Sequence, residues 1–167
     1  MCAILSDTVI FKSPTCTTAD IKCVEALAEI AGIEDFKELG MEMFRVKSAV
    51  QGTPVRDLVK RDFKDFDMHG NLVGIGQLEV IDLSVFDDIK ADLAKDIVAL
   101  KEEGQRHSVL LLLTDIMKEG SLMLVASDDG TIVEKAYDVV VDNGEVWLDG
   151  VLSRKKQVVP PLQDAFA

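Results

Sequence analysis

The stretch VLLLL at residues 109–113 is followed, after a Glu119-Gly120 turn, by a second apolar stretch, LMLVA, at residues 122–126. Continuous apolar runs of this length are consistent with strands that are buried on both faces of a sheet. Such a sheet needs other elements packed on both sides of it. The sequence therefore predicts an α/β fold whose core is this pair of strands.

Two more strands are expected upstream. Residues 62–68 alternate imperfectly between apolar and charged side chains, which favours an edge strand. Residues 72–81 are more apolar and predict a longer strand. Within it, Gly74 and Gly76 mark either a bulge or a close approach of neighbouring groups to the backbone.

Downstream, residues 131–137 predict a short helix, and residues 139–141 and 146–148 read as two further strand segments. The Asn-Gly centre of residues 142–145 favours a type I′ hairpin between them. Taken together, we expect a mixed β-sheet of about five strands flanked by helices.

A helical segment precedes the sheet. Residues 17–20 resemble a capping box, the helix that follows should end at Gly32, and residues 34–50 repeat an amphipathic pattern through Phe36, Leu39, Met43, Val46 and Val50. Residues 51–54 then form a candidate interdomain linker. Pro54 suits the start of a short helix.

The strongest helical pattern lies between a cap at residues 82–84 and Gly104. Its apolar positions are Val85, Ile89, Leu93, Ile97 and Leu100. We expect this helix to cover one face of the sheet.

The composition is that of a globular protein, with 48% hydrophobic and 29% charged residues among 167. A net charge of −12 argues against a nucleic-acid duplex or an anionic membrane as a partner, because both require a broad basic surface. No apolar run approaches the roughly 20 residues of a membrane span. Three cysteines without paired spacing predict buried or half-buried free thiols and a cytoplasmic setting.

Three consecutive cations, Arg154, Lys155 and Lys156, stand out near the end of this acidic chain. Such a cluster, followed by an apolar pair and prolines, suggests an anion clamp. On spacing alone, a solvated basic turn is the more frequent explanation.

The stretch SRKKQVVP at residues 153–160 resembles the carboxyl-terminal signature of the manganese-dependent, second-family inorganic pyrophosphatases of the DHH phosphoesterase superfamily. Residues 4–17, ILSDTVIFKSPTCT, resemble the segment that closes the catalytic domain of that family. The stretches at 27–32, 62–66 and 113–116 occur in the family's order. The resemblance therefore extends along the chain.

This resemblance implies a division of the chain. Residues 1–50 would be the terminal, helical segment of the DHH catalytic domain with its linker, and residues 54–167 the DHH-associated, substrate-binding domain. The Asp-His-His triplet of the catalytic domain is not in this sequence, whose only histidines, His69 and His107, read as loop or strand-edge residues. We therefore expect the chain alone to be almost inactive.

The resemblance also assigns site residues. Lys64, Arg154 and Lys155 match positions that hold the phosphate oxygens of pyrophosphate, with Ser153, Lys156 and Gln157 as supporting residues. From the residues alone, Lys64 would be read as a solvated surface lysine.

Asp7 matches a ligand of manganese, or of magnesium or cobalt, in the intact enzyme. Without the resemblance, Asp7 would be read as a cap at the end of an element. A catalytic metal site usually takes about three protein ligands, so this chain by itself should bind metal weakly or not at all.

Two other functions stay open: an exopolyphosphatase-like enzyme that acts on longer phosphate chains, and a non-catalytic phosphate-binding module. The expected partners are pyrophosphate and the amino-terminal DHH domain, and the sequence does not distinguish a monomer from a homodimer. The pair Lys12-Ser13 lacks the glycines of a phosphate-binding loop, and Gly74 and Gly76 lack the third glycine of a dinucleotide site.

Overall fold

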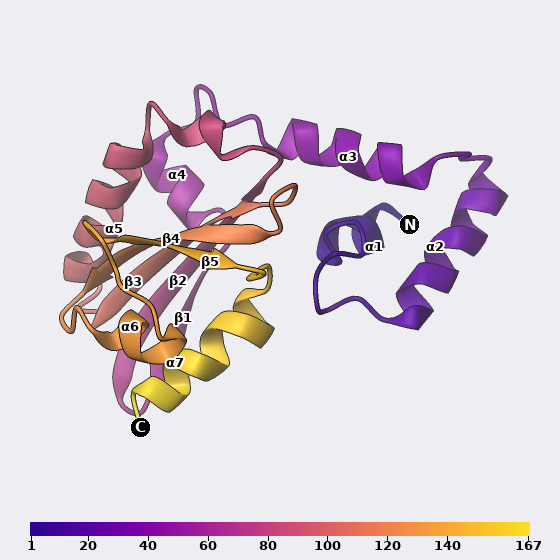
Figure 1. The fold of residues 1–167 in the computed structure, drawn as a ribbon. Coiled ribbons are helices and arrows are strands. Elements are labelled where there is room, and N and C mark those ends of the chain that lie inside the picture. The colour runs from indigo at the N-terminus through magenta and orange to yellow at the C-terminus, as the bar shows by residue number, and fades with distance from the viewer.

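The computed structural model describes residues 1–167. Figure 1 shows a sheet flanked by helices and, beside it, an arm made of helices α1 (Cys2–Asp7), α2 (Thr18–Ala31) and α3 (Phe36–Lys47). We call residues 1–50 the arm and residues 54–167 the body. Helix α3 leads from the arm to the body through a turn at residues 51–53. No helix is long and apolar enough to cross a membrane.

The body is built on one five-stranded mixed sheet, which confirms the predicted fold class. Its strands are adjacent in sequence order, β1 to β5. Strands β2 and β3 are parallel, whereas the other three neighbouring pairs are antiparallel. The strands are β1 (Phe63–Met68), β2 (Asn71–Val80), β3 (Ser108–Asp115), β4 (Gly120–Ser127) and β5 (Glu145–Asp149).

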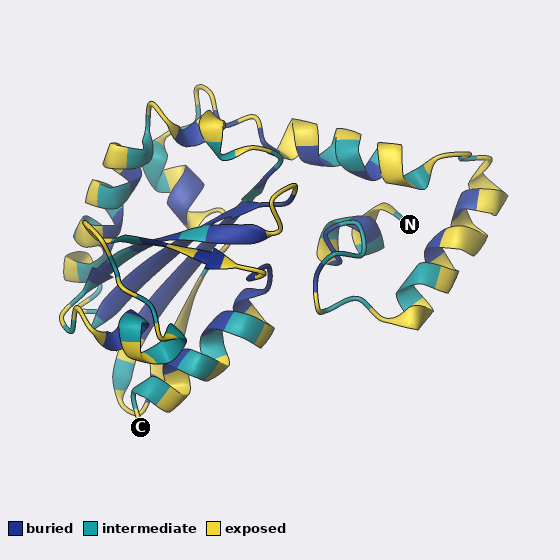
Figure 2. Cartoon of the chain, in the orientation of Figure 1, coloured by how far each residue is buried: buried dark blue, intermediate teal, exposed yellow.

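Every residue of β3 is buried, as its apolar sequence predicted (Figure 2). Because successive side chains of a strand point to opposite faces, Leu111 and Leu113 pack in one core cluster with residues of α4 (Val55–Lys60) and α5 (Lys90–Glu103). Leu110 and Leu112 pack in a second cluster on the other face, with residues of α6 (Ile132–Tyr137) and α7 (Val159–Ala165). The sheet is therefore covered on both sides.

Helix α2 begins and ends as the sequence predicted. The Thr17 hydroxyl accepts a hydrogen bond from the Asp20 amide, and the Asp20 carboxylate accepts one from the Thr17 amide. Gly32 ends the helix in the left-handed conformation, with φ of 65°. The expected face of α3 is only partly confirmed: Phe36, Leu39 and Met43 are half-buried and Val50 is buried, but Val46 is 70% exposed.

The actual buried face of α3 contains Gly40 and Phe44. A β-carbon added at Gly40 would lie 3.0 Å from Cγ1 of Ile10, so the glycine allows the preceding loop to pack directly against the helix. Phe44 packs with Val9 and Ile116 in a small third cluster that joins the arm to the body. A pattern based on large apolar residues does not count a glycine, so the prediction missed the centre of the buried face at Gly40 and wrongly included Val46.

The predicted helix at residues 82–104 is interrupted. Asp82 caps a short 3₁₀ turn, η1 (Leu83–Phe86), and the long helix α5 begins only at Lys90. Phe86 enters the core, whereas Val85 remains 36% exposed, so the apolar spacing from Val85 does not follow one continuous helix. The expected packing of Leu93, Ile97 and Leu100 against one sheet face is confirmed.

The turn at residues 142–145 is confirmed, with positive φ at Asn143 and Gly144 and with both cross-turn hydrogen bonds formed between Asp142 and Glu145. The predicted strand at residues 139–141 is wrong. The amide of Val139 donates to the Glu134 carbonyl, and the amide of Val141 donates to the Glu134 carboxylate, so this segment bonds to α6.

The structure decides between the two explanations for the glycines of β2. The pairing of β2 with β1 and β3 runs without interruption through both positions, which excludes a bulge. A β-carbon at Gly74 would lie 2.3 Å from Cζ of Phe63, and one at Gly76 would lie 2.9 Å from Cδ1 of Leu111. Both glycines therefore make room for neighbouring side chains.

The histidines and cysteines have no catalytic arrangement. His107 contacts the Ser108 hydroxyl at 2.8 Å and stacks edge-to-face on Phe166, and His69 lies in the exposed β1–β2 turn. The three cysteines are free, as expected, but Cys2 and Cys23 are exposed, which corrects the expectation of burial. These thiols lie on the open arm.

Candidate functional site

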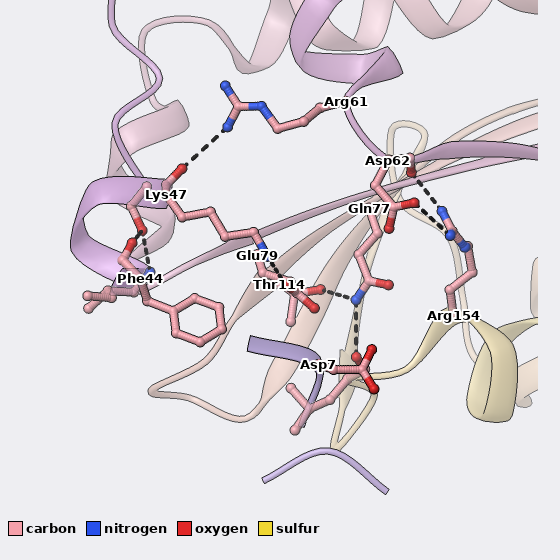
Figure 3. Close-up of polar contacts among 12 residues, drawn as sticks. Asp7, Phe44, Lys47, Arg61, Asp62, Gln77, Glu79, Thr114 and Arg154 are labelled. Atoms are coloured by element: carbon pink, nitrogen blue, oxygen red, sulfur yellow. Dashed lines mark hydrogen bonds and ion pairs between the residues drawn. The ribbon is translucent and has the colours of Figure 1, made fainter. Parts of the chain in front are cut away.

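A polar cavity of about 260 Å³ lies where the arm faces the body. It contains most of the site residues expected from the sequence, and Lys156 and Gln157 are the two that do not line it. Its lining residues are Asp7, Ser13, Thr15, Asp62, Lys64, Gln77, Glu79, Leu152, Ser153, Arg154 and Lys155. Figure 3 shows part of this region, with Asp7 from α1, Gln77 and Glu79 from β2 and Arg154 from the segment after β5.

The loop that carries Arg154 and Lys155 is held by Gln157. Its Oε1 accepts hydrogen bonds from the amides of Leu152 and Ser153, both at 3.0 Å, and its Nε2 donates to the Gly150 carbonyl at 2.8 Å. These bonds fold the residues after β5 around one amide side chain. Gln157 therefore supports the loop from behind and does not face the cavity.

The same loop leads into a π-helical turn, η2 (Arg154–Val158), which continues as α7. The Ser153 hydroxyl accepts from the Lys156 amide at 3.4 Å and so begins this turn. The Tyr137 hydroxyl donates to the Gln157 carbonyl at 3.0 Å. Burial raises the pKa of Tyr137, so the hydroxyl keeps its proton and remains a donor.

A buried polar chain joins the loop to the sheet. Gln77 Nε2 donates to the Thr114 hydroxyl at 3.0 Å and to the Leu152 carbonyl at 3.1 Å (Figure 3). Thr114 contacts the Ser121 hydroxyl at 2.8 Å, and Ser121 donates to the Val151 carbonyl at 2.7 Å. Buried polar groups that are fully hydrogen-bonded in this way rigidify the structure around them. The loop is therefore fixed to β2, β3 and β4.

Arg154 is only 5% exposed and is bound to the start of β1 and to β2. Its Nη1 donates to the carbonyls of Asp62 and Ile75, at 2.6 and 3.2 Å. Its Nη2 donates to the Asp62 carboxylate at 2.8 Å (Figure 3). Its Nε is buried and has no partner. The guanidinium is thus positioned, with part of its donor capacity unused.

Lys64 and Lys155 are both exposed, and neither forms an ion pair or a hydrogen bond through its ammonium group. Lys64 lies on β1 and Lys155 follows Arg154, so two distant parts of the sequence bring two free cations to one cavity. Lys156 points elsewhere, because its Nζ donates to the Pro14 carbonyl at 2.7 Å. It connects the body to the arm.

Six cavity residues were not expected from the sequence, and three of them, Asp62, Gln77 and Glu79, have charged or amide side chains. Gln77 and Glu79 could have been found as polar residues at alternate positions of an otherwise apolar strand. Glu79 forms an ion pair with Lys47 of α3, and Asp62 forms one with Arg154. Only the folded structure reveals these pairings.

Asp7 reaches the cavity from the end of α1, and the backbone after it is unusual. Residues 9–11 all have positive φ, between 51° and 68°. Left-handed backbone costs a non-glycine residue about 1–2 kcal/mol. The Thr8 hydroxyl accepts from the Phe11 amide at 3.2 Å, and Val9 is buried against Ile116. This packing sustains a strained turn beside the site.

The Asp7 carboxylate makes no hydrogen bond and so does not cap α1; Thr15 contacts only its backbone carbonyl. No group of three or more His, Cys, Asp or Glu side chains in this chain could hold a metal ion. The donor set therefore does not fit a complete manganese, magnesium or cobalt site. Asp7 lines the same cavity as the two free lysines and has a free carboxylate.

A family model and several known proteins match this chain. Residues 41–165 match the model of the DHHA2 domain. The chain is 49% identical to the manganese-dependent inorganic pyrophosphatase of Methanocaldococcus jannaschii, over 98% of this chain and 53% of that protein. It is 42% identical to the cobalt-dependent inorganic pyrophosphatase of Clostridium perfringens, over 96% of this chain and 29% of that protein.

A crystal structure from Methanococcus jannaschii that is named for family II inorganic pyrophosphatases has the same fold. The TM-score is 0.92 and the identity 47%, over 98% of this chain and 53% of that chain. The chain thus spans about half the length of most of the curated relatives it matches. With its family match over residues 41–165, the chain belongs to the DHHA2 domain family and is related along nearly its whole length to the manganese-dependent inorganic pyrophosphatases.

Proposed function

We propose that this chain is the substrate-binding part of a metal-dependent inorganic pyrophosphatase and holds pyrophosphate for hydrolysis to two phosphates. The observation that carries the proposal is the polar cavity in which Lys64, Arg154 and Lys155 meet. The net charge of the chain, −12, repels anions, so a local set of cations is needed to bind one. The relatives' names point to the same substrate.

Each cation has a distinct role in this proposal. Lys64 and Lys155 are movable point charges that neutralise phosphate oxygens, because their ammonium groups have no competing partner. Arg154 offers the unengaged Nε edge of its guanidinium from a fixed position. Ser153 and Gln157 hold the loop backbone, and neither needs to touch the substrate.

The family implies a divalent metal, which would activate water and neutralise charge on the phosphates. Asp7 would contribute one ligand, and the other ligands would come from residues outside this chain. The residues present here bind and orient the substrate. The arm then belongs with a DHH catalytic domain, and the body, from residue 54, is the substrate-binding domain.

Calorimetric titration of the chain with pyrophosphate at low salt, with and without Mn²⁺, tests this function. Lys155→Ala and Lys64→Ala remove exposed, unpaired side chains, so the fold should be unaffected. A hydrogen bond to a charged group contributes about 1.5–3 kcal/mol, so each variant should weaken binding by about tenfold or more. Arg154→Ala should abolish binding but will also lose three hydrogen bonds within the protein.

Lys22→Ala, on the exposed side of α2, is the matched control and should bind like the parent chain. Titration with tripolyphosphate distinguishes an exopolyphosphatase-like site, which would prefer the longer chain. A folded chain that binds pyrophosphate no better than Lys155→Ala does would disprove the proposed clamp.

The purified chain with Mn²⁺ should release no phosphate from pyrophosphate above the protein-free rate, because it cannot complete the metal site. A colorimetric phosphate assay measures this directly. Substantial metal-dependent turnover by the chain alone would contradict the assignment of catalysis to residues outside it.

A further inference from the structure

One edge of the Arg154 guanidinium is fully engaged within the protein. Nη1 and Nη2 form the end-on fork of an arginine, and here they donate to the carbonyl and the carboxylate of the same residue, Asp62, at 2.6 and 2.8 Å. The second Nη1 proton bonds to the Ile75 carbonyl at 3.2 Å. Three of the five donors of a guanidinium are therefore used.

The two unused donors lie together. Nε and the remaining proton of Nη2 form the side-on edge of the guanidinium, which matches two oxygens of a phosphate. Nε is buried without a partner, and an unmet buried donor costs roughly 1–3 kcal/mol. An oxyanion bound on this edge would satisfy it.

Asp62 is an unexpected residue for such a cavity. Asp62 lines the same cavity as Lys64 and Lys155, and its side chain is 52% exposed. A carboxylate beside a bound polyanion is unfavourable by like-charge repulsion. Its presence in the cavity is explained if it holds one of the cations in the orientation that binds phosphate.

We propose that Asp62 is a positioning residue, which grips the end-on fork of Arg154 and leaves the side-on edge for a phosphate group of the substrate. This inference rests on the proposed function. The alternative is that Asp62 competes with phosphate for Arg154. The two mechanisms predict opposite changes in the affinity for pyrophosphate when Asp62 is removed. Loss of a positioning residue weakens binding, whereas loss of a competitor strengthens it.

Two substitutions separate them in the pyrophosphate titration. Asp62→Ala removes the acceptor and the charge, and should weaken binding by about tenfold, the equivalent of one charge-assisted hydrogen bond. Asp62→Asn keeps an oxygen acceptor for Nη2 and removes the repulsive charge, so its affinity should stay within about threefold of the parent or improve.

The matched control is Asp65→Ala, three residues along the chain in β1. Asp65 also accepts a bidentate pair, from Nε and Nη2 of Arg106 at 2.6 and 2.8 Å, but it does not line the cavity. This variant should bind pyrophosphate like the parent chain. Unchanged or tighter binding by Asp62→Ala, or an equal loss in Asp62→Asn, would overturn the proposal.

A second measurement needs no pyrophosphate. Phenylglyoxal modifies accessible arginines, and mass spectrometry reports the rate at each site. Asp62→Ala should increase the rate at Arg154 several-fold, Asp62→Asn should not, and Asp65→Ala should increase the rate at Arg106 instead. An unchanged Arg154 rate in Asp62→Ala would refute the positioning role. If the parent chain does not bind pyrophosphate, the proposed function fails while this measurement still decides the role of Asp62.

Discussion

Replacing Gln157 with alanine should destabilise the chain and weaken the anion site together. The side chain accepts hydrogen bonds from two amides and donates to one carbonyl, all within the loop at residues 150–153. Leu152 and Ser153 are 5% and 7% exposed, so their amides would lose their only partner in a nearly dry environment. The same loop leads directly into Arg154 and Lys155.

The expected loss follows from these contacts. An unsatisfied buried amide costs roughly 1–3 kcal/mol, and the low end applies because Gln157 is half-buried and water can partly replace it. Two amides at about 1 kcal/mol each, with a smaller contribution from the Gly150 carbonyl, give about 2–3 kcal/mol. Gln157→Glu should lose less, because both acceptor bonds remain and only the donated bond disappears.

Urea unfolding followed by far-ultraviolet circular dichroism measures the free energy of unfolding by linear extrapolation. Gln163→Ala is the matched control, because this glutamine of α7 is exposed and makes no hydrogen bond through its side chain. Surface substitutions of this kind usually change stability by less than about 0.5 kcal/mol. A similarly small change in Gln157→Ala would refute the reasoning that the loop depends on this amide.

Two further predictions concern packing and pH. Gly74→Ala places a β-carbon 2.3 Å from Cζ of Phe63, so it should lower the free energy of unfolding by about 1–3 kcal/mol, as measured by urea unfolding. Gly130→Ala, where no atom lies within 4 Å, should be nearly neutral, and an equal loss there would contradict the packing argument. Hydrogen bonds from the amide and hydroxyl of Thr131, and then from Lys135, lower the pKa of Asp129 to about 2. This stabilisation is complete above the ordinary pKa of 3.8 and is lost as the pH falls toward 2. A carboxyl NMR titration should show a midpoint near 2, and Thr131→Val should raise it; an unchanged midpoint would exclude the hydroxyl as a cause.

Local signals in the sequence predicted most of the elements because those elements depend on neighbours in the chain. The capping box at residues 17–20 and the turn at residues 142–145 are set by bonds over three residues. The apolar run at residues 109–113 identified the central strand, because a strand that reads as apolar throughout must be covered on both faces. These features need no information from distant segments.

The errors occurred where a distant segment decided the outcome. The loop at Ile10 packs on Gly40 and places the centre of the buried face of α3 at Gly40 and Phe44, so that Val46 is exposed. Glu134 of α6 bonded the segment at residues 139–141 and kept it out of the sheet. Secondary-structure propensity and the spacing of apolar residues do not include contacts with distant segments.

The cations of the site are all visible in the sequence, and the family resemblance groups three of them: Lys64, Arg154 and Lys155. Which of them is paired and which is free depends on the fold. Pairing of β1 with β2 places Asp62 against Arg154, whereas Lys64 and Lys155 remain unpaired. Ion pairs and burial depend on distances between segments some 90 residues apart, and no local pattern specifies those distances.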